Sequence, residues 1–289
     1  EYDSTFKWRL TVAEGQPRFA AFDIDQTMYR WSLFLDQIDM MIEMKLMDPS
    51  IREDAQEARR RWEDREGTYD AYVEAQVLRF RQWGMAGVSV EDLVRVSRKL
   101  LQRKNGRQYI FTRELLKTLR VLNYKTAAIS GSTVQVVKIF AEHWGFDRWI
   151  GTEFEIGTDG RFTGDDAKTV RHYLVKNVLF ENLRRELCCS ENDSIAVGDA
   201  LSDLPMLVAA QYPIAFNPDA PLEEMARKQR IPVVKERKSV ITILRASGPN
   251  HPSPIGSDGF VEETVFGILP LDVATCLRDR LRDIGVHLR

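Results

Sequence analysis

The feature that most limits the fold of this chain is an alternation of short apolar strands and amphipathic helices from about residue 111 onward. The apolar runs lie at 125–130, 194–199, 213–217 and 231–234, and helix-forming segments separate them at 112–122, 133–145, 171–187 and from about 202. Such alternation is typical of a parallel sheet that is covered by helices on both faces. We therefore predict an α/β fold with a Rossmann-like parallel sheet as its core.

A block of helices interrupts this pattern between the first apolar strand, 18–22, and the second. It is rich in helix formers, and turn residues divide it into predicted helices at 33–47, 51–66, 68–83 and 89–104. This order predicts an all-helical cap inserted into the core. The predicted domains are a core of residues 1–30 and 105–245, a helical cap of residues 31–104, and a linker with a C-terminal helical extension over 246–289.

Composition excludes several classes of function. The net charge is −2, from 41 basic and 43 acidic residues, so nothing favours nucleic-acid binding. No apolar stretch approaches the roughly 18 residues that span a bilayer. Three cysteines, two of them adjacent, form no disulfide framework, which favours a reducing, cytoplasmic setting. The oligomeric state stays open, as does the presence of a leader before Glu1.

The segment 18–27, RFAAFDIDQT, carries the strongest chemical signal. Side chains at alternate positions of a strand point to the same side, so Asp23 and Asp25 share one face where a buried strand ends. Two carboxylates this close repel each other unless a cation or a proton lies between them. The alternative is that these aspartates only cap the next helix.

Other predicted strands also end in polar residues. The strand at 125–130 ends in Ser130-Gly131-Ser132, and the strand at 194–199 ends in Gly198-Asp199, with Asp203 four residues on. A helix between them carries Lys176. Because open parallel sheets bind ligands at the carboxyl ends of their strands, we expect these groups to meet in one site.

This ordered set resembles the haloacid dehalogenase-like (HAD) hydrolases, which are mainly phosphatases. The resemblance covers roughly residues 18–235 and rests on DxDxT, a serine at a strand end, a lysine on a helix, and GDxxSD. It is closest to the phosphoserine-phosphatase-like branch (subfamily IB), which has a helical C1 cap. The resemblance implies a Mg²⁺-dependent phosphomonoester hydrolase that acts on a small phosphorylated substrate through a phospho-aspartate.

The resemblance also implies roles for individual residues. Asp23 would be the nucleophile, and Asp25 would protonate the leaving alcohol and then activate water. Mg²⁺ would be held by the side chains of Asp23 and Asp199 and by the backbone carbonyl of Asp25. Phosphate would be bound by Ser130, Gly131 and Lys176, and Lys176 would also be catalytic. Asp203 and Thr27 would orient the ligands.

Two lysines compete for the lysine position. In similar phosphatases it opens the helix before GDxxSD, about two dozen residues ahead of the aspartate. Lys176 lies 23 residues before Asp199, whereas Lys168 lies 31 before it in a loop-like segment. We therefore predict Lys176.

Several positions depart from the family pattern. Gln26 stands where glycine is usual, so either the local backbone is ordinary or the site is adjusted for an unusual substrate. Ser32 and Gln76 stand near the positions where phosphoserine phosphatases use a glutamate and an arginine. Arg30 is expected to form a salt bridge, with contact to an anionic substrate as the alternative.

The methionines at 40, 44 and 47 share a helix face, and we expect them to pack in the cap core. The alternative is an apolar pocket for a lipid-like or aromatic leaving group.

Two other functions stay open at this point. The same intermediate could pass its phosphoryl group to another alcohol, which would make the protein a phosphotransferase. Alternatively, the protein is a catalytically weak HAD-like protein that binds a partner. A dehalogenase fits less well, because carbon–halogen displacement does not need the metal that Asp25 and Asp199 suit.

Overall fold

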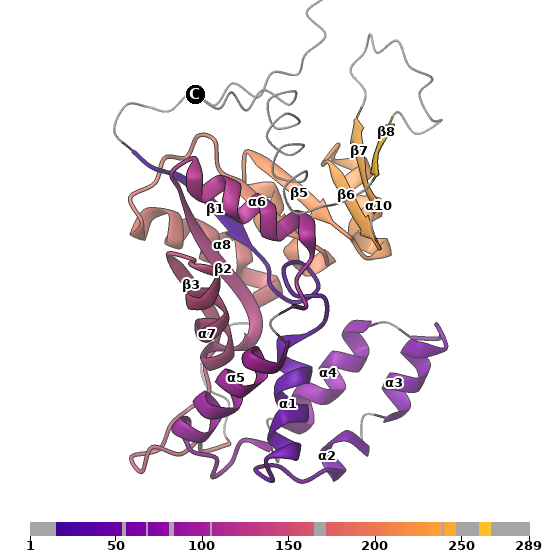
Figure 1. The fold of residues 1–289 in the computed structure, drawn as a ribbon. Coiled ribbons are helices and arrows are strands. Elements are labelled where there is room, and N and C mark those ends of the chain that lie inside the picture. Colours follow the sequence, from indigo (N-terminus) through magenta and orange to yellow (C-terminus); the bar gives the residue numbers. More distant parts are fainter. Residues whose placement is uncertain are drawn as a thin grey trace, which may run out of the picture.

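The computed structural model describes residues 16–53, 56–67, 69–80, 84–104, 106–164, 172–238, 240–246 and 260–266. Figure 1 shows a sheet with helices packed around it and a lobe of further helices attached at one end. The predicted α/β fold with a largely parallel sheet is confirmed.

The sheet contains eight strands in the order β3-β2-β1-β4-β5-β6-β7-β8. The strands are β1 (Arg18–Phe22), β2 (Tyr124–Thr133), β3 (Arg148–Thr152), β4 (Ile195–Gly198), β5 (Tyr212–Phe216), β6 (Val233–Arg237), β7 (Val240–Ala246) and β8 (Phe260–Phe266). Neighbours from β3 to β6 are parallel, and β7 and β8 extend the sheet in antiparallel pairs.

The sequence does not predict β7 and β8, and β8 lies inside the segment 246–289 that was expected to be a linker and a helical extension. The turn between β6 and β7 has Lys238 at φ 55°, yet its Lys-Ser sequence lacks the Asn-Gly or Asp-Gly signature of such turns. The predicted helix at 271–285 lies outside the described residues.

Alternate residues of β1 bury their side chains in two different cores. Phe22 packs with Phe146, with ring centroids 5.8 Å apart, on the face that α6 and α7 cover. Phe19 packs on Phe180 of α8 at 5.0 Å, on the face that α8, α9 and α10 cover. Because both faces of β1 are buried, the strand reads as a continuous apolar run that leads directly to Asp23.

The helices divide into two groups. Those that lie between β1 and β2 in the chain and precede residue 105 are α1 (Leu33–Glu43), α2 (Ser50–Glu53), α3 (Gln56–Glu63), α4 (Tyr69–Arg79) and α5 (Val90–Lys104). Those that flank the sheet are α6 (Ile110–Val121), α7 (Val134–Trp144), α8 (His172–Glu186), α9 (Leu204–Ala209) and α10 (Ala220–Lys228). A short 3-10 turn, Leu201–Asp203, precedes α9.

We call the first group, α1 to α5, the helical lobe. The helices predicted over 68–83 and 89–104 correspond to α4 and α5, whereas the single helix predicted over 51–66 is instead the pair α2 and α3. The helix predicted over 33–47 ends at Glu43, so Met44 and Met47 lie beyond α1 and do not share a helix face with Met40. Met40 and Met47 are buried in the same hydrophobic cluster as Leu93 and Leu100 of α5, as expected for core packing. The domain boundaries themselves stay a prediction.

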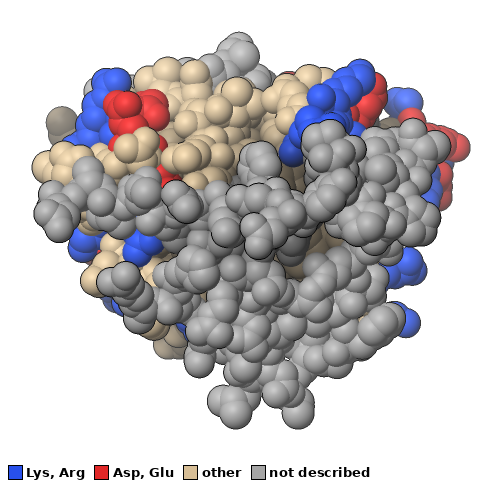
Figure 2. Space-filling view, turned by 90° about the horizontal axis from the view of Figure 1, so that it is seen from above, with Lys and Arg blue, Asp and Glu red and all other residues tan. Residues whose placement is uncertain are grey.

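Charged side chains are mixed on the face of the molecule that Figure 2 shows, where blue and red atoms of the described residues lie next to one another. Elsewhere in the described part of the chain, many charged side chains form ion pairs within one helix, such as Arg60 with Glu57 of α3 at 2.7 Å. In the part of the chain that the structure describes, we find no helix both long enough and apolar enough to cross a bilayer.

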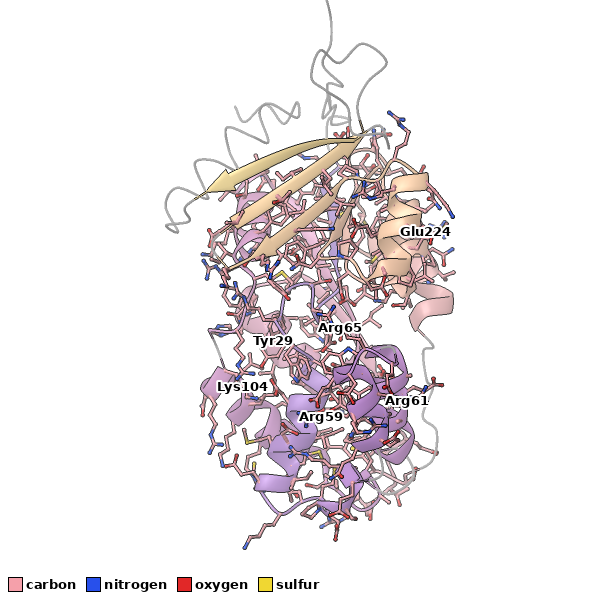
Figure 3. The ribbon with its side chains drawn as sticks, turned by 90° about the vertical axis from the view of Figure 1, so that its right-hand side faces the viewer. Tyr29, Arg59, Arg61, Arg65, Lys104 and Glu224 are labelled. Carbon is pink, nitrogen blue, oxygen red and sulfur yellow. The ribbon has the colours of Figure 1, made fainter. Side chains whose placement is uncertain are left out.

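The chain passes between the lobe and the core twice, and hydrogen bonds join the two passages. The amide of Arg30 donates to the carbonyl of Arg107 at 2.7 Å, and the amide of Tyr109 donates to the carbonyl of Met28 at 3.1 Å. The Tyr29 hydroxyl also donates to Asp36 of α1 at 2.5 Å. We call these two paired passages, residues 28–32 and 106–109, the hinge; Figure 3 labels Tyr29 in the first passage and Lys104 at the end of α5.

A buried carboxylate on β6 contacts the first passage of the hinge and the start of α6, which follows the second passage. Glu236 accepts hydrogen bonds from Arg30 at 2.5 Å and from the amides of Ile110 and Phe111, at the start of α6, at 3.1 and 2.8 Å. Its side chain is 0% exposed, and negative charge is favoured at a helix N-terminus. Arg30 therefore forms the expected structural salt bridge.

Replacing Glu236 by Ala is expected to lower the free energy of unfolding by about 2–3 kcal/mol, because Arg30 and two α6 amides lose their buried acceptor. Urea denaturation measures the change. The control is Glu224→Ala, which removes a carboxylate that is 67% exposed and should change stability by less than about 0.5 kcal/mol. Equal shifts for the two variants would contradict the assignment of Glu236 as a buried clamp.

Candidate active site

The predicted site residues meet at the carboxyl ends of three neighbouring strands. Asp23 directly follows β1, Ser130 lies near the end of β2, and Asp199 directly follows β4. The order β2-β1-β4 puts β1 in the middle, and the Asp23 amide donates to the carbonyl of Val197 on β4 at 2.9 Å. The topology thus brings together residues that are more than a hundred positions apart.

A buried lysine lies between two of the aspartates. Lys176 of α8 is 4% exposed; its Nζ donates to Asp23 Oδ1 at 2.7 Å and also to Asp203 Oδ1. Gly198 makes this arrangement possible, because a Cβ at that position would lie 2.6 Å from Asp203 Oδ2. Lys168 lies outside the described residues.

The third aspartate, Asp199, is held through its side chain by Thr27 and through its backbone amide by Asp203. Thr27 Oγ1 donates to Asp199 Oδ1 at 2.6 Å. Asp203 Oδ2 accepts from the amides of Asp199 and Ala200, at 2.9 and 3.0 Å. Asp203 and Thr27 therefore contact the other site residues directly.

Asp23, Asp199 and Asp203 together form a buried acidic cluster, in which one ligand oxygen from each lies within 4.8 Å of the others. Burial raises the pKa of Asp23 well above its ordinary value; Lys176 opposes this effect, and the neighbouring carboxylates add to it. Burial also raises the pKa of Asp199, and repulsion from Asp23 and Asp203 raises it further.

Lys176 stays charged in this site, since the aspartates outweigh its burial. Burial alone would lower the pKa of Lys176, but Asp203 and Asp23 raise it above its ordinary value. The cluster therefore holds three carboxyl groups beside one ammonium group, which contacts two of them. A cation with a preference for oxygen ligands, such as Mg²⁺, fits this donor set.

Asp25 is held by two serines and by the helical lobe. Its Oδ2 accepts from Ser130 Oγ at 2.6 Å and from Ser132 Oγ at 2.9 Å, and its Oδ1 accepts from the Leu33 amide, at the start of α1, at 2.6 Å. Ser132 is a contact of Asp25 that is not among the residues predicted from the sequence. Its spacing could have revealed this contact, because Ser130 and Ser132 alternate along β2 and so share a face.

Gly131 differs from its two serine neighbours. It is exposed, and its carbonyl accepts from Thr152 Oγ1 at 2.7 Å. The Ser132 amide donates to Ser130 Oγ at 3.0 Å. The structure thus brings Ser130 into contact with Asp25, and Gly131 lies between the two serines that hold this carboxylate.

Gln26 adopts a backbone conformation that favours glycine. Its φ is 63°, and its backbone N–H donates to the backbone carbonyl of Trp31 at 3.0 Å. The local backbone is therefore not ordinary, and a side chain is carried in a left-handed conformation that costs about 1–2 kcal/mol.

Gln26→Gly is expected to raise the free energy of unfolding by about 0.5–1 kcal/mol, the net of relieved strain and greater chain entropy in the unfolded state. Thermal or urea denaturation measures it. Asp159→Gly serves as a control, since Asp159 is exposed and is absent from the residues with positive φ. Equal or lower stability in Gln26→Gly would show that the Gln26 side chain contributes interactions of its own.

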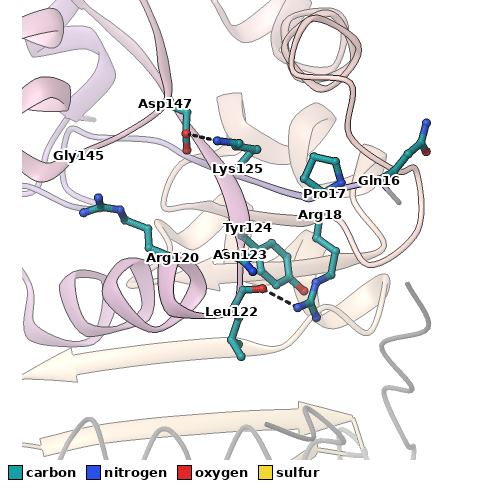
Figure 4. Close-up of a pocket in the computed structure, with 10 residues that line it drawn as sticks. All are labelled: Gln16, Pro17, Arg18, Arg120, Leu122, Asn123, Tyr124, Lys125, Gly145 and Asp147. Atoms are coloured by element: carbon teal, nitrogen blue, oxygen red, sulfur yellow. Dashed lines mark hydrogen bonds and ion pairs between the residues drawn. The ribbon is translucent and has the colours of Figure 1, made fainter. Parts of the chain in front are cut away.

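A separate cavity of about 620 Å³ opens at the opposite ends of β1 and β2 (Figure 4). It is basic, but its cations do not converge. Arg18 donates to a backbone carbonyl at 2.6 Å, and Lys125 pairs with Asp147 at 3.0 Å. Arg120 extends to the other side of the cavity from Arg18 in Figure 4. This cavity is lined by none of the predicted site residues.

Comparison with known proteins identifies the family of this chain. The family model of haloacid dehalogenase-like hydrolases matches residues 20–208. A histidinol-phosphatase of Neisseria meningitidis is 27% identical over 226 residues, which cover 74% of this chain and 97% of that protein. A phosphoserine phosphatase of Archaeoglobus fulgidus is 29% identical over 142 residues, 49% of this chain and 39% of that protein.

Solved structures show the same fold. A Bordetella pertussis protein described as of unknown function superposes with a TM-score of 0.61 at 21% identity, over 75% of this chain and 98% of that one. A phosphoserine phosphatase in its apo form superposes with a TM-score of 0.51 at 20% identity, over 72% of this chain and 90% of that one. With a family match that covers more than half of its length, the chain belongs to the haloacid dehalogenase-like hydrolases, in their phosphoserine-phosphatase-like branch.

Proposed function

We propose that this protein is a Mg²⁺-dependent phosphatase that hydrolyses a small phosphorylated metabolite through a phospho-Asp23 intermediate. The observation that carries the proposal is the buried contact of Lys176 with Asp23 and Asp203 beside Asp199, at the carboxyl ends of neighbouring strands. A structural ion pair alone would not need the third buried carboxyl group, that of Asp199, since burying uncompensated charge is costly.

In the first step, a carboxylate oxygen of Asp23 bonds to phosphorus, and the bond from phosphorus to the leaving oxygen breaks. The electron pair of that bond stays with the leaving oxygen, which takes a proton from the Asp25 carboxyl group. Lys176 fixes Asp23 for attack and offsets negative charge as the new bond forms. Ser130 and the Gly131 amide would bind phosphate oxygens, so Ser130 would exchange its bond to Asp25 for one to the substrate.

In the second step, Asp25 is a carboxylate and accepts a proton from water. The water oxygen bonds to phosphorus, the bond to Asp23 breaks, and inorganic phosphate leaves with Asp23 restored. Asp25 suits both steps, because the bonds from Ser132 and from the Leu33 amide hold it in one orientation.

The residues that would hold Mg²⁺ are Asp23 and Asp199, through their side chains, and Asp25, through its backbone carbonyl. When bound, Mg²⁺ would offset the repulsion between the carboxylates and an incoming phosphate. Asp203 and Thr27 would orient these ligands through the bonds that they make to Lys176 and Asp199.

The helical lobe would select the leaving group. Its first helix begins at the Leu33 amide, which contacts Asp25, so the position of the lobe and the orientation of the acid are linked. Closure of the lobe would exclude water from the first step.

The free thiols of Cys188 and Cys189 agree with the reducing, cytoplasmic setting that we propose.

The direct test is hydrolysis of p-nitrophenyl phosphate with Mg²⁺ and with excess chelator. We expect turnover only with Mg²⁺, and a loss of about 10²-fold or more in Asp199→Asn, because that change removes a charged ligand. The matched control is Asp219→Asn, a nearby carboxylate outside the buried cluster. Equal turnover in chelator and in Mg²⁺ would contradict the proposal.

A further inference from the structure

Three aromatic side chains form a continuous ladder from the hinge into the helical lobe. Trp31 and Trp62 have ring centroids 5.7 Å apart, and Trp62 stacks on Tyr72 at 5.8 Å with an interplanar angle of 10°. We call these three residues the aromatic wall. Tyr72 is buried, whereas Trp31 and Trp62 are only half-buried.

The wall begins in the same loop as the proposed acid and base. The carbonyl of Trp31 accepts from the Gln26 amide at 3.0 Å, and two residues later the Leu33 amide donates to Asp25. Figure 3 labels Tyr29, just before Trp31, and Arg65, just after Trp62; both lie where the helical lobe meets the core. The wall is therefore continuous, through the backbone, with the loop that carries the proposed acid and base.

A buried amide on the same helix face as Tyr72 supplies a second, polar observation. Gln76 follows Tyr72 by four residues on α4, so the two side chains are neighbours on that helix. Gln76 is 4% exposed, and among the described residues its Oε1 has no hydrogen-bond partner. A buried carbonyl oxygen without a donor is costly, which is a reason to expect that a ligand supplies one.

We propose that the leaving alcohol carries a planar ring with an N–H group. The ring would stack against Trp62 and Trp31, and the N–H would donate to Oε1 of Gln76. This inference rests on the proposed phosphatase function and adds the class of its substrate. Flat rings suit this wall because aromatic pairs gain energy beyond the area that they bury.

The ring is tested with two esters of similar leaving-group chemistry, benzyl phosphate and cyclohexylmethyl phosphate. We expect kcat/KM to be about fivefold higher for the flat ring in the wild type. Trp62→Leu should bring the ratio near one, and Trp62→Phe should restore most of it. Trp144→Leu is the matched control, since it removes a tryptophan at the far end of α7 and should leave the ratio unchanged.

The outcomes separate this inference from the proposed function. Hydrolysis of both esters at equal kcat/KM would overturn the aromatic preference and leave the phosphatase proposal standing. Failure of the wild type to hydrolyse any phosphate ester with Mg²⁺ would overturn both.

The N–H group is tested with Gln76→Leu and histidinol phosphate, whose imidazole ring carries such a donor. We expect the ratio of kcat/KM for histidinol phosphate over that for benzyl phosphate to fall about tenfold, the loss of about 1.4 kcal/mol from one hydrogen bond. The melting temperature should stay the same or rise, since the change removes an unpaired buried acceptor. An unchanged ratio, or a ratio that falls only together with the melting temperature, would overturn the role of Gln76.

Discussion

Asp23→Asn is expected to lower kcat for a phosphate ester by about 10⁴-fold or more, because an amide oxygen cannot attack phosphorus as a carboxylate does. The substitution preserves the shape of the side chain and its acceptor for Lys176, which lies 2.7 Å from Oδ1. Steady-state kinetics with p-nitrophenyl phosphate measures the loss.

The fold should tolerate this change, which keeps the interpretation simple. Burial already raises the pKa of Asp23, so a neutral side chain suits the site without metal, and Lys176 keeps its partner Asp203. The melting temperature of metal-free Asp23→Asn should therefore equal or exceed that of the wild type. Asp159→Asn, on an exposed turn, is the matched control for kinetics. Residual activity above about 1% of the wild type would contradict the role of Asp23 as nucleophile.

Lys176→Met is expected to have a double effect. It should lower the free energy of unfolding by about 3–5 kcal/mol, because Asp203 would keep a buried charge without its cation and Asp23 would lose its hydrogen-bond donor. It should also lower kcat by about 10²–10³-fold, since the positive charge beside the reacting oxygen is lost. Urea denaturation and kinetics on the folded fraction measure the two effects separately.

Lys228→Met is the control for this prediction. Lys228 is 62% exposed and pairs with Glu224 along α10, so its removal should change stability by less than about 1 kcal/mol and leave kcat unchanged. The role of Lys176 would be wrong if its variant matched this control in both measurements. A large loss of stability with wild-type kcat would reduce Lys176 to a structural ion pair.

Much of the site could be read from the sequence, because its signals are local. The strand that delivers Asp23 and Asp25 is a continuous apolar run, and the helix start that carries Lys176 lies at a recognisable distance from GDxxSD. The meeting of these residues in one site then follows from the rule that neighbouring parallel strands end at the same edge of a sheet. The roles of these residues remain proposals, whereas their proximity is a property of the fold.

The contacts that escaped prediction are long-range or lack a local signature. Glu236 pairs with Arg30 across 206 positions, and the sequence around either residue carries no pattern that predicts this ion pair. Ser132 reaches Asp25 across 107 positions and differs from an ordinary polar strand end only in its spacing from Ser130. The positive φ of Gln26 is likewise invisible in its side chain, since glutamine has no preference for that conformation.

The central claim is that turnover passes through a phosphoryl group on Asp23, and one measurement tests it most directly. The wild-type protein is mixed with Mg²⁺ and a phosphate ester, quenched in acid within a single turnover, and digested for mass spectrometry. We predict that the peptide with Asp23 gains the mass of one phosphoryl group, which Asp23→Asn abolishes. Turnover with no phosphoryl group on that peptide, or with one on another residue, would contradict the account.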